Sequence, residues 1–290
     1  MIGHLIHIGY AKAGSTFLQR WFEAHPQLAY RGGGICGFNT IFQIGNEAVA
    51  RGPRPLYRVT SSEDLSSPRP NVGNKQANFD RNGRASMAEE ERAVFDILCP
   101  LFPNATILVI TRGFRSIALS SYSQYLRSGG ELSFTSLVNG AQHERPWNYD
   151  RLISLYREGF GHDRVIVLPF ELLRDDPEAF CQHLQHRLGL NPVSVSRARV
   201  NEALSPVELA WYPRLAAFAR RVPIVRRRGI GMAAFTNRLR LPIRLLQMIY
   251  PIEQVTEAAI TDEMLESLRG QAECLRDEPL FAAYKKEYLL

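Results

Sequence analysis

Short apolar runs alternate with helical patterns along the chain up to about residue 190. Buried strands are predicted at 5–8, 105–111 and 164–169, and a further strand at 56–60. Helices are predicted between and after them, at 16–24, 87–98, 115–127, 149–160 and 176–188. Strands that alternate with helices form βαβ units, so the pattern predicts a mostly parallel sheet with helices on both faces.

The fold class is therefore α/β, with three α/β/α layers, followed by a helical C-terminal region. Only helical patterns occur beyond about residue 200, at 205–221, 232–248 and 261–275. The chain is predicted to form one domain over residues 1–290, with an α/β core at 1–206 and the helical region at 207–290. Residues 66–86 are rich in Pro, Asn, Gly and Arg and are predicted to form a long surface loop.

Composition and charge narrow the class of protein. The 290 residues carry a net charge of +6, which favours anionic partners such as nucleic acid, a phosphate-rich cofactor, an acidic glycan or a membrane surface. The four cysteines lie far apart without a C-x-x-C pair, as is typical of reduced thiols in a cytosolic protein. No signal-peptide pattern and no apolar stretch of about 18 residues is present, so a cytoplasmic protein is expected.

The turn at 9–16 (GYAKAGST) joins the first strand to the first helix and has the composition of an anion site. Backbone N–H groups at such a turn converge on an anion, Ser15 and Thr16 add hydroxyls, and Lys12 adds a positive charge. Gly9 and Gly14 have the spacing of a Walker A loop, but the lysine precedes the second glycine instead of following it. This position argues against a nucleotide kinase, which remains an alternative, as does an incidental glycine turn.

A second anion site is predicted where the strand at 105–111 ends. Arg112 follows that strand at its carboxyl end, where ligands bind in open α/β sheets, and Ser120 lies eight residues further on the next helix. A guanidinium donates two parallel, charge-assisted hydrogen bonds to a phosphate. Two predicted anion sites, each at the end of a strand and about 100 residues apart, are stronger evidence for a nucleotide site than either alone.

Three segments resemble sulfotransferases that use 3′-phosphoadenosine 5′-phosphosulfate (PAPS). Residues 11–18 (AKAGSTFL) resemble the family's 5′-phosphosulfate loop, P-K-S/A-G-T-T-x-L, with Ala11 and Ser15 as departures. Residues 112–122 resemble R-N-P-x-x-x-x-x-S-x-Y, with Gly-Phe in place of Asn-Pro. Residues 168–177 resemble a Y-E-x-x-x-x-x-P segment in which Phe170 replaces the tyrosine. The resemblance extends from about residue 4 to 206.

The resemblance implies a P-loop-like fold and transfer of a sulfuryl group from PAPS to an acceptor hydroxyl or amine, which leaves 3′-phosphoadenosine 5′-phosphate (PAP). No metal is required. It also implies roles at the cofactor for ten residues, with Arg228 and Gly229 assigned by a weaker likeness to the family's late R-K-G-x-x-G loop. The implied PAPS ligands are Lys12, Ala13, Gly14, Ser15 and Thr16 at the 5′-phosphosulfate, Arg112 and Ser120 at the 3′-phosphate, Phe170 at the adenine, and Arg228 and Gly229.

Transfer requires a cation at the leaving oxygen and a base at the acceptor. Lys12 is the predicted cation. Glu63, just after the strand at 56–60 and near the position of the family's histidine, is the candidate base; the alternative is a helix cap or a solvated carboxylate. Ser62 is a candidate for orienting the acceptor, and Lys75 is either a second cation or a solvated loop residue. The histidines at 4 and 7 are interpreted as structural.

Eight arginines and no acidic residue lie between residues 220 and 244. With the apolar residues around Arg244, the region 220–249 is compatible with peripheral membrane contact, with a patch for an acidic substrate, or with a solvated helical face. The preferred acceptor is a carbohydrate or glycolipid, and a small phenolic or natural-product acceptor is the alternative. No nucleic-acid-binding motif is present, so nucleic acid is not expected as a partner, although a module that binds it through charge alone is a further alternative.

Overall fold

The computed structural model describes most of the chain, in two compact units. One unit contains residues 1–113, 144–200 and 268–290, and the other contains 114–143 and 201–267. The described residues are 2–49, 54–66, 86–127, 130–140, 147–193, 204–221, 240–257 and 260–290.

The first unit is built on a five-stranded sheet in the order β2-β3-β1-β4-β5, in which every pair of neighbours is parallel. The strands are β1 (Gly3–His7), β2 (Leu28–Ala29), β3 (Tyr57–Ser61), β4 (Thr106–Thr111) and β5 (Val165–Pro169). β1 and β4 lie in the middle, and their side chains at Leu5, Ile6 and 107–110 are inaccessible to solvent. Strands covered on both faces read as continuous apolar runs, as the sequence predicted.

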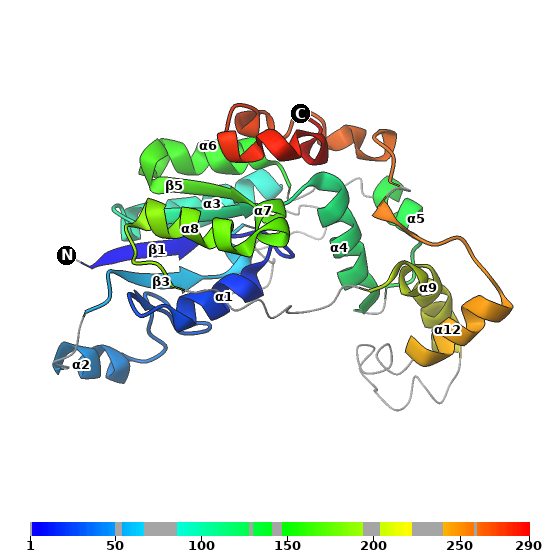
Figure 1. The fold of residues 1–290 in the computed structure, drawn as a ribbon, viewed down its shortest axis with the longest axis horizontal. Helices are drawn as coiled ribbons and strands as arrows, with labels where there is room; N and C mark the ends of the chain where they lie inside the picture. The colour runs from blue at the N-terminus through cyan, green and yellow to red at the C-terminus, as the bar shows by residue number, and fades with distance from the viewer. Residues whose placement is uncertain are drawn as a thin grey trace. The chain divides into compact units, whose positions relative to one another are not determined.

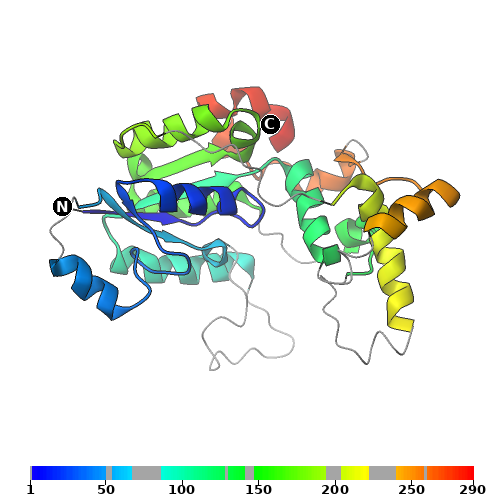
Figure 2. The same ribbon diagram turned by 60° about the horizontal axis from the view of Figure 1, so that its bottom comes forward.

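Helices cover both faces of this sheet, as Figures 1 and 2 show. One face carries α1 (Ser15–Ala24) and α8 (Pro177–Leu188), and the other carries α3 (Met87–Leu101) and α6 (Tyr149–Phe160). His25, after α1, contacts the carbonyl of Asn191, after α8, with Nε2 at 3.2 Å. The predicted three-layer α/β/α fold is confirmed.

The remaining elements depart from the predicted pattern in several places. The helix expected at 261–275 appears as two short 3-10 segments, because Gly270 adopts a φ of 73° between them. Helices at 41–49, 134–140, 170–175 and 279–288 were not predicted. The other elements are α2 (Ile41–Val49), α4 (Phe114–Arg127), α5 (Phe134–Gly140), α7 (Phe170–Asp175), α9 (Pro206–Arg221), α12 (Arg240–Ile249), and the 3-10 helices η1 (Glu63–Leu65), η2 (His162–Arg164), η4 (Glu263–Leu268), η5 (Glu273–Leu275) and η6 (Pro279–Tyr288).

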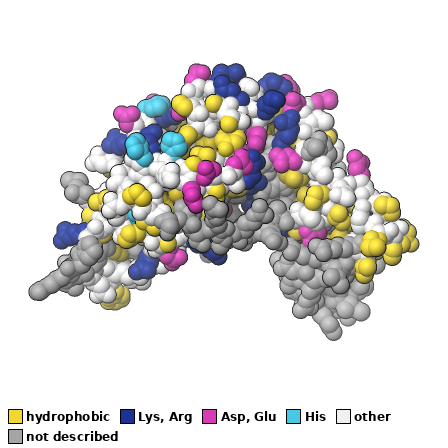
Figure 3. Space-filling view, in the orientation of Figure 1, with side chains coloured by type: hydrophobic (Ala, Val, Ile, Leu, Met, Phe, Trp, Pro, Cys, Tyr) yellow, Lys and Arg dark blue, Asp and Glu magenta, His cyan; other side chains and the backbone are white. Residues whose placement is uncertain are grey.

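The second unit is helical. In it α9 packs against α4 and α12, and Trp211 Nε1 donates to Gln247 Oε1 at 2.7 Å. The far end of α12 exposes a run of apolar side chains, visible over that helix in Figure 3: Leu245, Met248, Ile249 and Tyr250. Within the described ranges, no helix combines the length and apolar character needed to cross a membrane.

Residues 268–290 pack in the first unit together with the sheet. The expected division of the chain near residue 206 stays a prediction. Much of the expected helix at 232–248 and nearly all of the expected loop at 66–86 lie outside the described residues.

Candidate functional site

Four of the parallel strands end at the same edge of the sheet, and every described candidate residue of the first unit follows one of those ends. The turn at 9–14 follows β1, Glu63 follows β3, Arg112 follows β4 and Phe170 follows β5. The carboxyl edge of an open parallel sheet is where such folds bind ligands. The topology therefore gathers these predicted residues on one side of the sheet.

The turn after β1 has a backbone that few residues adopt. Lys12 and Gly14 have φ values of 69° and 87°, both in the left-handed region. A Cβ at Gly14 would lie 2.7 Å from Leu173 Cδ2, so a side chain there would meet α7. The helix α1 then begins at Ser15 without a side-chain cap. Its first N–H groups therefore receive no side-chain acceptor from the cap position.

Ser15 supplies a second, independent sign of a ligand. Its side chain is buried, and its Oγ has no hydrogen-bond partner among the described residues. A buried hydroxyl without a partner is costly. An anion held by the N-terminus of α1 would accept from this hydroxyl and from the adjacent backbone N–H groups, and the positive end of the helix dipole would stabilise it. The turn thus fits a phosphate or phosphosulfate group.

Arg112 connects the end of β4 to this turn. Its Nη1 donates to the carbonyl oxygen of Lys12 at 2.5 Å. The guanidinium also lies over the Phe170 ring, 4.3 Å from the centroid, as a cation–π contact. The same ring borders Gly14, since a Cβ there would lie 3.2 Å from Phe170 Cδ2. The structure therefore brings Lys12, Gly14, Arg112 and Phe170 together.

A buried polar cluster between β1 and β3 lies next to the turn. His7 Nδ1 lies 2.8 Å from Ser61 Oγ, and burial lowers the pKa of His7 to about 4. Gly9 has no room for a side chain, because its Cβ would lie 2.2 Å from His7 Nε2. Ser66 Oγ donates to the carbonyl of Gly9 at 3.1 Å, which ties η1 to the turn.

Glu63 is half-buried at the start of η1, on the same edge as the turn. Ser62 caps that helix, because its hydroxyl accepts from the N–H of Asp64 at 3.3 Å. The hydroxyl keeps its own proton to donate, and the role of Ser62 in orienting an acceptor stays a prediction. The role of Glu63 as a base stays a prediction.

Several predicted ligands are not brought to the site by the described contacts. Ser120 lies half-buried on α4, in the second unit, so its part in binding a 3′-phosphate stays a prediction. Lys75, Arg228 and Gly229 lie outside the described residues.

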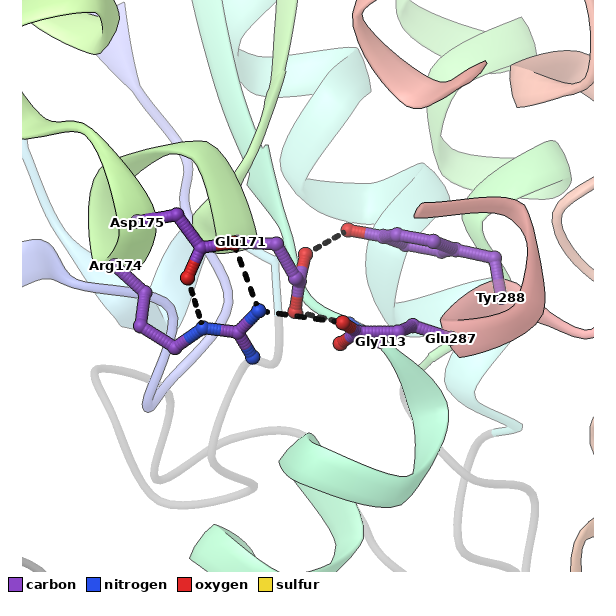
Figure 4. Close-up of polar contacts among 6 residues, drawn as sticks. All are labelled: Gly113, Glu171, Arg174, Asp175, Glu287 and Tyr288. Carbon is purple, nitrogen blue, oxygen red and sulfur yellow. Dashed lines mark hydrogen bonds and ion pairs between the residues drawn. The ribbon is translucent and has the colours of Figure 1, made fainter. Parts of the chain in front are cut away.

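Sequence reasoning missed the residues that hold the backbone around Arg112. The Tyr149 hydroxyl donates to the carbonyl of Arg112 at 2.5 Å and accepts from its N–H at 3.3 Å. Glu171, fully buried, accepts from the N–H of Gly113 at 2.9 Å and from the hydroxyl of Tyr288 at 2.7 Å (Figure 4). Burial raises the pKa of Glu171, while the two hydrogen bonds lower it. Glu171 belonged to a quoted motif, but no pattern marked Tyr149 or Tyr288.

The described residues contain no group of three or more His, Cys, Asp or Glu side chains that could hold a metal ion. The arrangement is that of an α/β protein in which a turn that fits an anion and a guanidinium lie at the carboxyl edge of a parallel sheet.

Comparison with known proteins gives a family match over part of the chain. Residues 90–194, which contain β4, α4, β5 and α7, match the model of the sulfotransferase family. The resemblance to sulfotransferases predicted from the sequence is thereby confirmed over this segment. Among curated proteins, none matches the sequence.

Two solved structures align over most of their length. A sulfotransferase from Alicyclobacillus acidocaldarius is 18% identical, with a TM-score of 0.45, and the alignment covers 84% of this chain and 96% of that one. A mouse sulfotransferase complexed with PAP is 12% identical, with a TM-score of 0.41 and coverage of 98% and 88%. With TM-scores below 0.5, neither structural alignment establishes the fold, which is assigned from the five-stranded parallel sheet and its helices.

Proposed function

We propose that this chain is a PAPS-dependent sulfotransferase that moves a sulfuryl group to an acceptor hydroxyl by in-line displacement. The observation that carries the proposal is the hydrogen bond from Arg112 to the carbonyl of Lys12. It joins the two predicted anion sites, and PAPS carries two anionic groups, a 5′-phosphosulfate and a 3′-phosphate.

The proposed donor site uses both anion sites. The 5′-phosphosulfate would lie at the turn, where the backbone from Ala13 to Thr16 and the unpartnered Ser15 hydroxyl face it. Arg112 would hold the 3′-phosphate, and Ser120 is proposed as a further ligand of that phosphate by family likeness. The Phe170 ring, which already carries the guanidinium, would border the adenine. Arg228 and Gly229 are proposed as further ligands by family likeness.

In the proposed reaction the acceptor oxygen bonds to sulfur while the bond between sulfur and the 5′-phosphate oxygen breaks. That phosphate oxygen takes the electron pair, and the ammonium of Lys12 stabilises its charge. The carboxylate of Glu63 takes the proton of the acceptor hydroxyl. The proposal needs no metal, because Lys12 and the N–H groups of the turn supply the positive potential.

We propose a carbohydrate or glycolipid as the acceptor, because a chain with a net charge of +6 attracts acidic glycans. A small phenolic or natural-product acceptor is the alternative. We also propose peripheral membrane contact through residues 220–249, where exposed apolar side chains at the end of α12 adjoin the arginine-rich segment. The cytoplasmic location stays a prediction.

A transfer assay tests the reaction and its base. The protein is incubated with PAPS and a panel of glycans, glycolipids and phenols, and mass spectrometry detects the gain of one sulfuryl group. Replacing the base with an amide, Glu63→Gln, should lower the rate about 10²–10⁴-fold without weakening PAP binding. The matched control is Asp64→Asn, the neighbouring carboxylate in η1, which should retain the rate.

The outcomes separate the parts of the proposal. An unchanged rate in Glu63→Gln would remove the base assignment and leave the donor site standing. Turnover of ATP that depends on Mg²⁺, with no transfer from PAPS, would favour a nucleotide kinase instead.

A further inference from the structure

Tyr288, the third residue from the end of the given sequence, lies next to the end of β4 in the interior of the first unit. Only 1% of its surface is exposed. Its hydroxyl donates to Glu171 Oε2 at 2.7 Å and lies 3.0 Å from Thr111 Oγ1. Because the tyrosine proton goes to Glu171, the Thr111 hydroxyl is the donor to Tyr288. The hydroxyl therefore connects β4 to the start of α7.

Glu171 also bonds to the backbone of Gly113, the residue after Arg112. Its other oxygen, Oε1, accepts from the N–H of Gly113 at 2.9 Å. A buried carboxylate is stabilised by such donors, and losing one of them leaves its charge less compensated. Tyr288, Glu171 and the peptide of Gly113 thus form one hydrogen-bonded chain, which Figure 4 shows from end to end.

The neighbouring residue, Glu287, packs directly on this peptide. A Cβ at Gly113 would lie 2.6 Å from Glu287 Cβ and 3.1 Å from its carbonyl oxygen, so only glycine permits the contact. Glu287 also pairs with Arg174 on α7, with Oε1 and Nη2 3.3 Å apart. The C-terminal segment is therefore attached to both sides of the peptide that follows Arg112.

The opposite side of Arg112 is held by Tyr149, whose hydroxyl bonds to both the N–H and the carbonyl of that residue. The Tyr149 and Tyr288 rings are neighbours, with centroids 5.9 Å apart. The backbone from 111 to 113 is thus clamped between two buried tyrosines. A clamped backbone fixes the direction in which the Arg112 side chain leaves β4, toward the carbonyl of Lys12.

We propose that Tyr288 is a positioning residue of the nucleotide site: through Glu171 and Gly113 it holds Arg112 in place for the 3′-phosphate. The inference rests on the proposed function, because it assigns the 3′-phosphate to Arg112. It gives the C-terminal segment 279–288 a task at the donor site, although that segment lies far from the site in the sequence.

The test compares two nucleotides that differ only at the 3′ position. PAP and adenosine 5′-phosphate are titrated by calorimetry into the full chain and into Tyr288→Phe, which removes only the hydroxyl. PAP binding should weaken about tenfold, while binding of adenosine 5′-phosphate should change by less than about twofold, because only PAP engages Arg112. The control is Tyr156→Phe, a fully buried tyrosine whose hydroxyl has no partner among the described residues.

Each outcome has one meaning. Equal weakening for both nucleotides, or no change for either, would overturn the positioning role. If Tyr288→Phe fails to fold, the isosteric Thr111→Val variant, which removes the other partner of the hydroxyl, should show a smaller loss confined to PAP. If the unaltered chain binds neither nucleotide, the proposed function itself fails.

Discussion

Arg112 is held at several points, and they explain why a lysine would not replace it. Its peptide bonds to Tyr149, its Nη1 bonds to the carbonyl of Lys12, and its planar guanidinium lies on the Phe170 ring. A lysine ammonium carries the charge but does not stack and donate in one plane. The site depends on shape as well as on charge.

The buried histidine His7, next to the turn, predicts that the protein loses stability in mild acid. Burial lowers its pKa from 6.5 to about 4, so the folded protein holds it neutral. The unfolded chain binds the proton more readily than the folded protein does. The stability of the folded state that depends on neutral His7 is therefore complete above pH 6.5 and is lost as the pH falls toward 4. The loss in the free energy of unfolding should be at most about 3 kcal/mol.

Urea unfolding at neutral pH and near pH 5 measures this loss. The slope against pH should shrink in His7→Gln and persist in His186→Gln, a control at an exposed histidine on α8. Equal slopes in both variants would contradict the assignment to His7.

Candidate site residues could be predicted from the sequence where a motif fixes their distance from the end of a strand. Lys12, Gly14 and Arg112 were found because their chemistry depends on their distance from strand ends. Tyr149 and Tyr288 were not, because each acts through a hydroxyl on a backbone group brought near only by folding. The chain contains eleven tyrosines, and no sequence pattern around Tyr149 or Tyr288 distinguishes them from the other nine.

At the scale of elements, the apolar runs predicted four of the five strands and their parallel arrangement. The two-residue strand β2 escaped because it is too short to carry a pattern. Gly270, with its positive φ, explains why η4 and η5 replace the expected helix. Periodicity predicts where a helix is favoured, and one left-handed residue is enough to end it.

The exposed apolar end of the helix α12 predicts binding to anionic membranes. Its exposed residues Met248 and Ile249 follow a segment with eight arginines and no acidic residue. The chain should therefore sediment with anionic phosphatidylserine vesicles at low salt and be released at high salt. Replacing both residues by serine should weaken binding by about tenfold or more, because their apolar surface enters the interface.

The matched control changes Phe42 and Ile44 to serine on α2, an exposed apolar helix without a basic residue. Sedimentation that is unaffected by the α12 changes, or equal with neutral vesicles, would contradict the proposed membrane contact.

At the scale of the whole molecule, the first unit is assembled from three separate stretches of sequence. Residues 268–290 pack with the sheet, whose five strands lie between residues 3 and 169, and they contact it at the end of β4. A sequence pattern predicts each stretch but not which stretches meet. That information resides in buried contacts such as the one between Tyr288 and Glu171.

The central claim is that the turn after β1 and Arg112 together bind the donor nucleotide. Calorimetric titration with PAP tests it directly. The account predicts saturable binding at one site, weakened at least about tenfold in both Lys12→Ala and Arg112→Ala because each removes charge-assisted hydrogen bonds. The exposed control Arg92→Ala should bind as the unaltered chain does. Absence of PAP binding, or equal affinity in all three variants, would contradict the account.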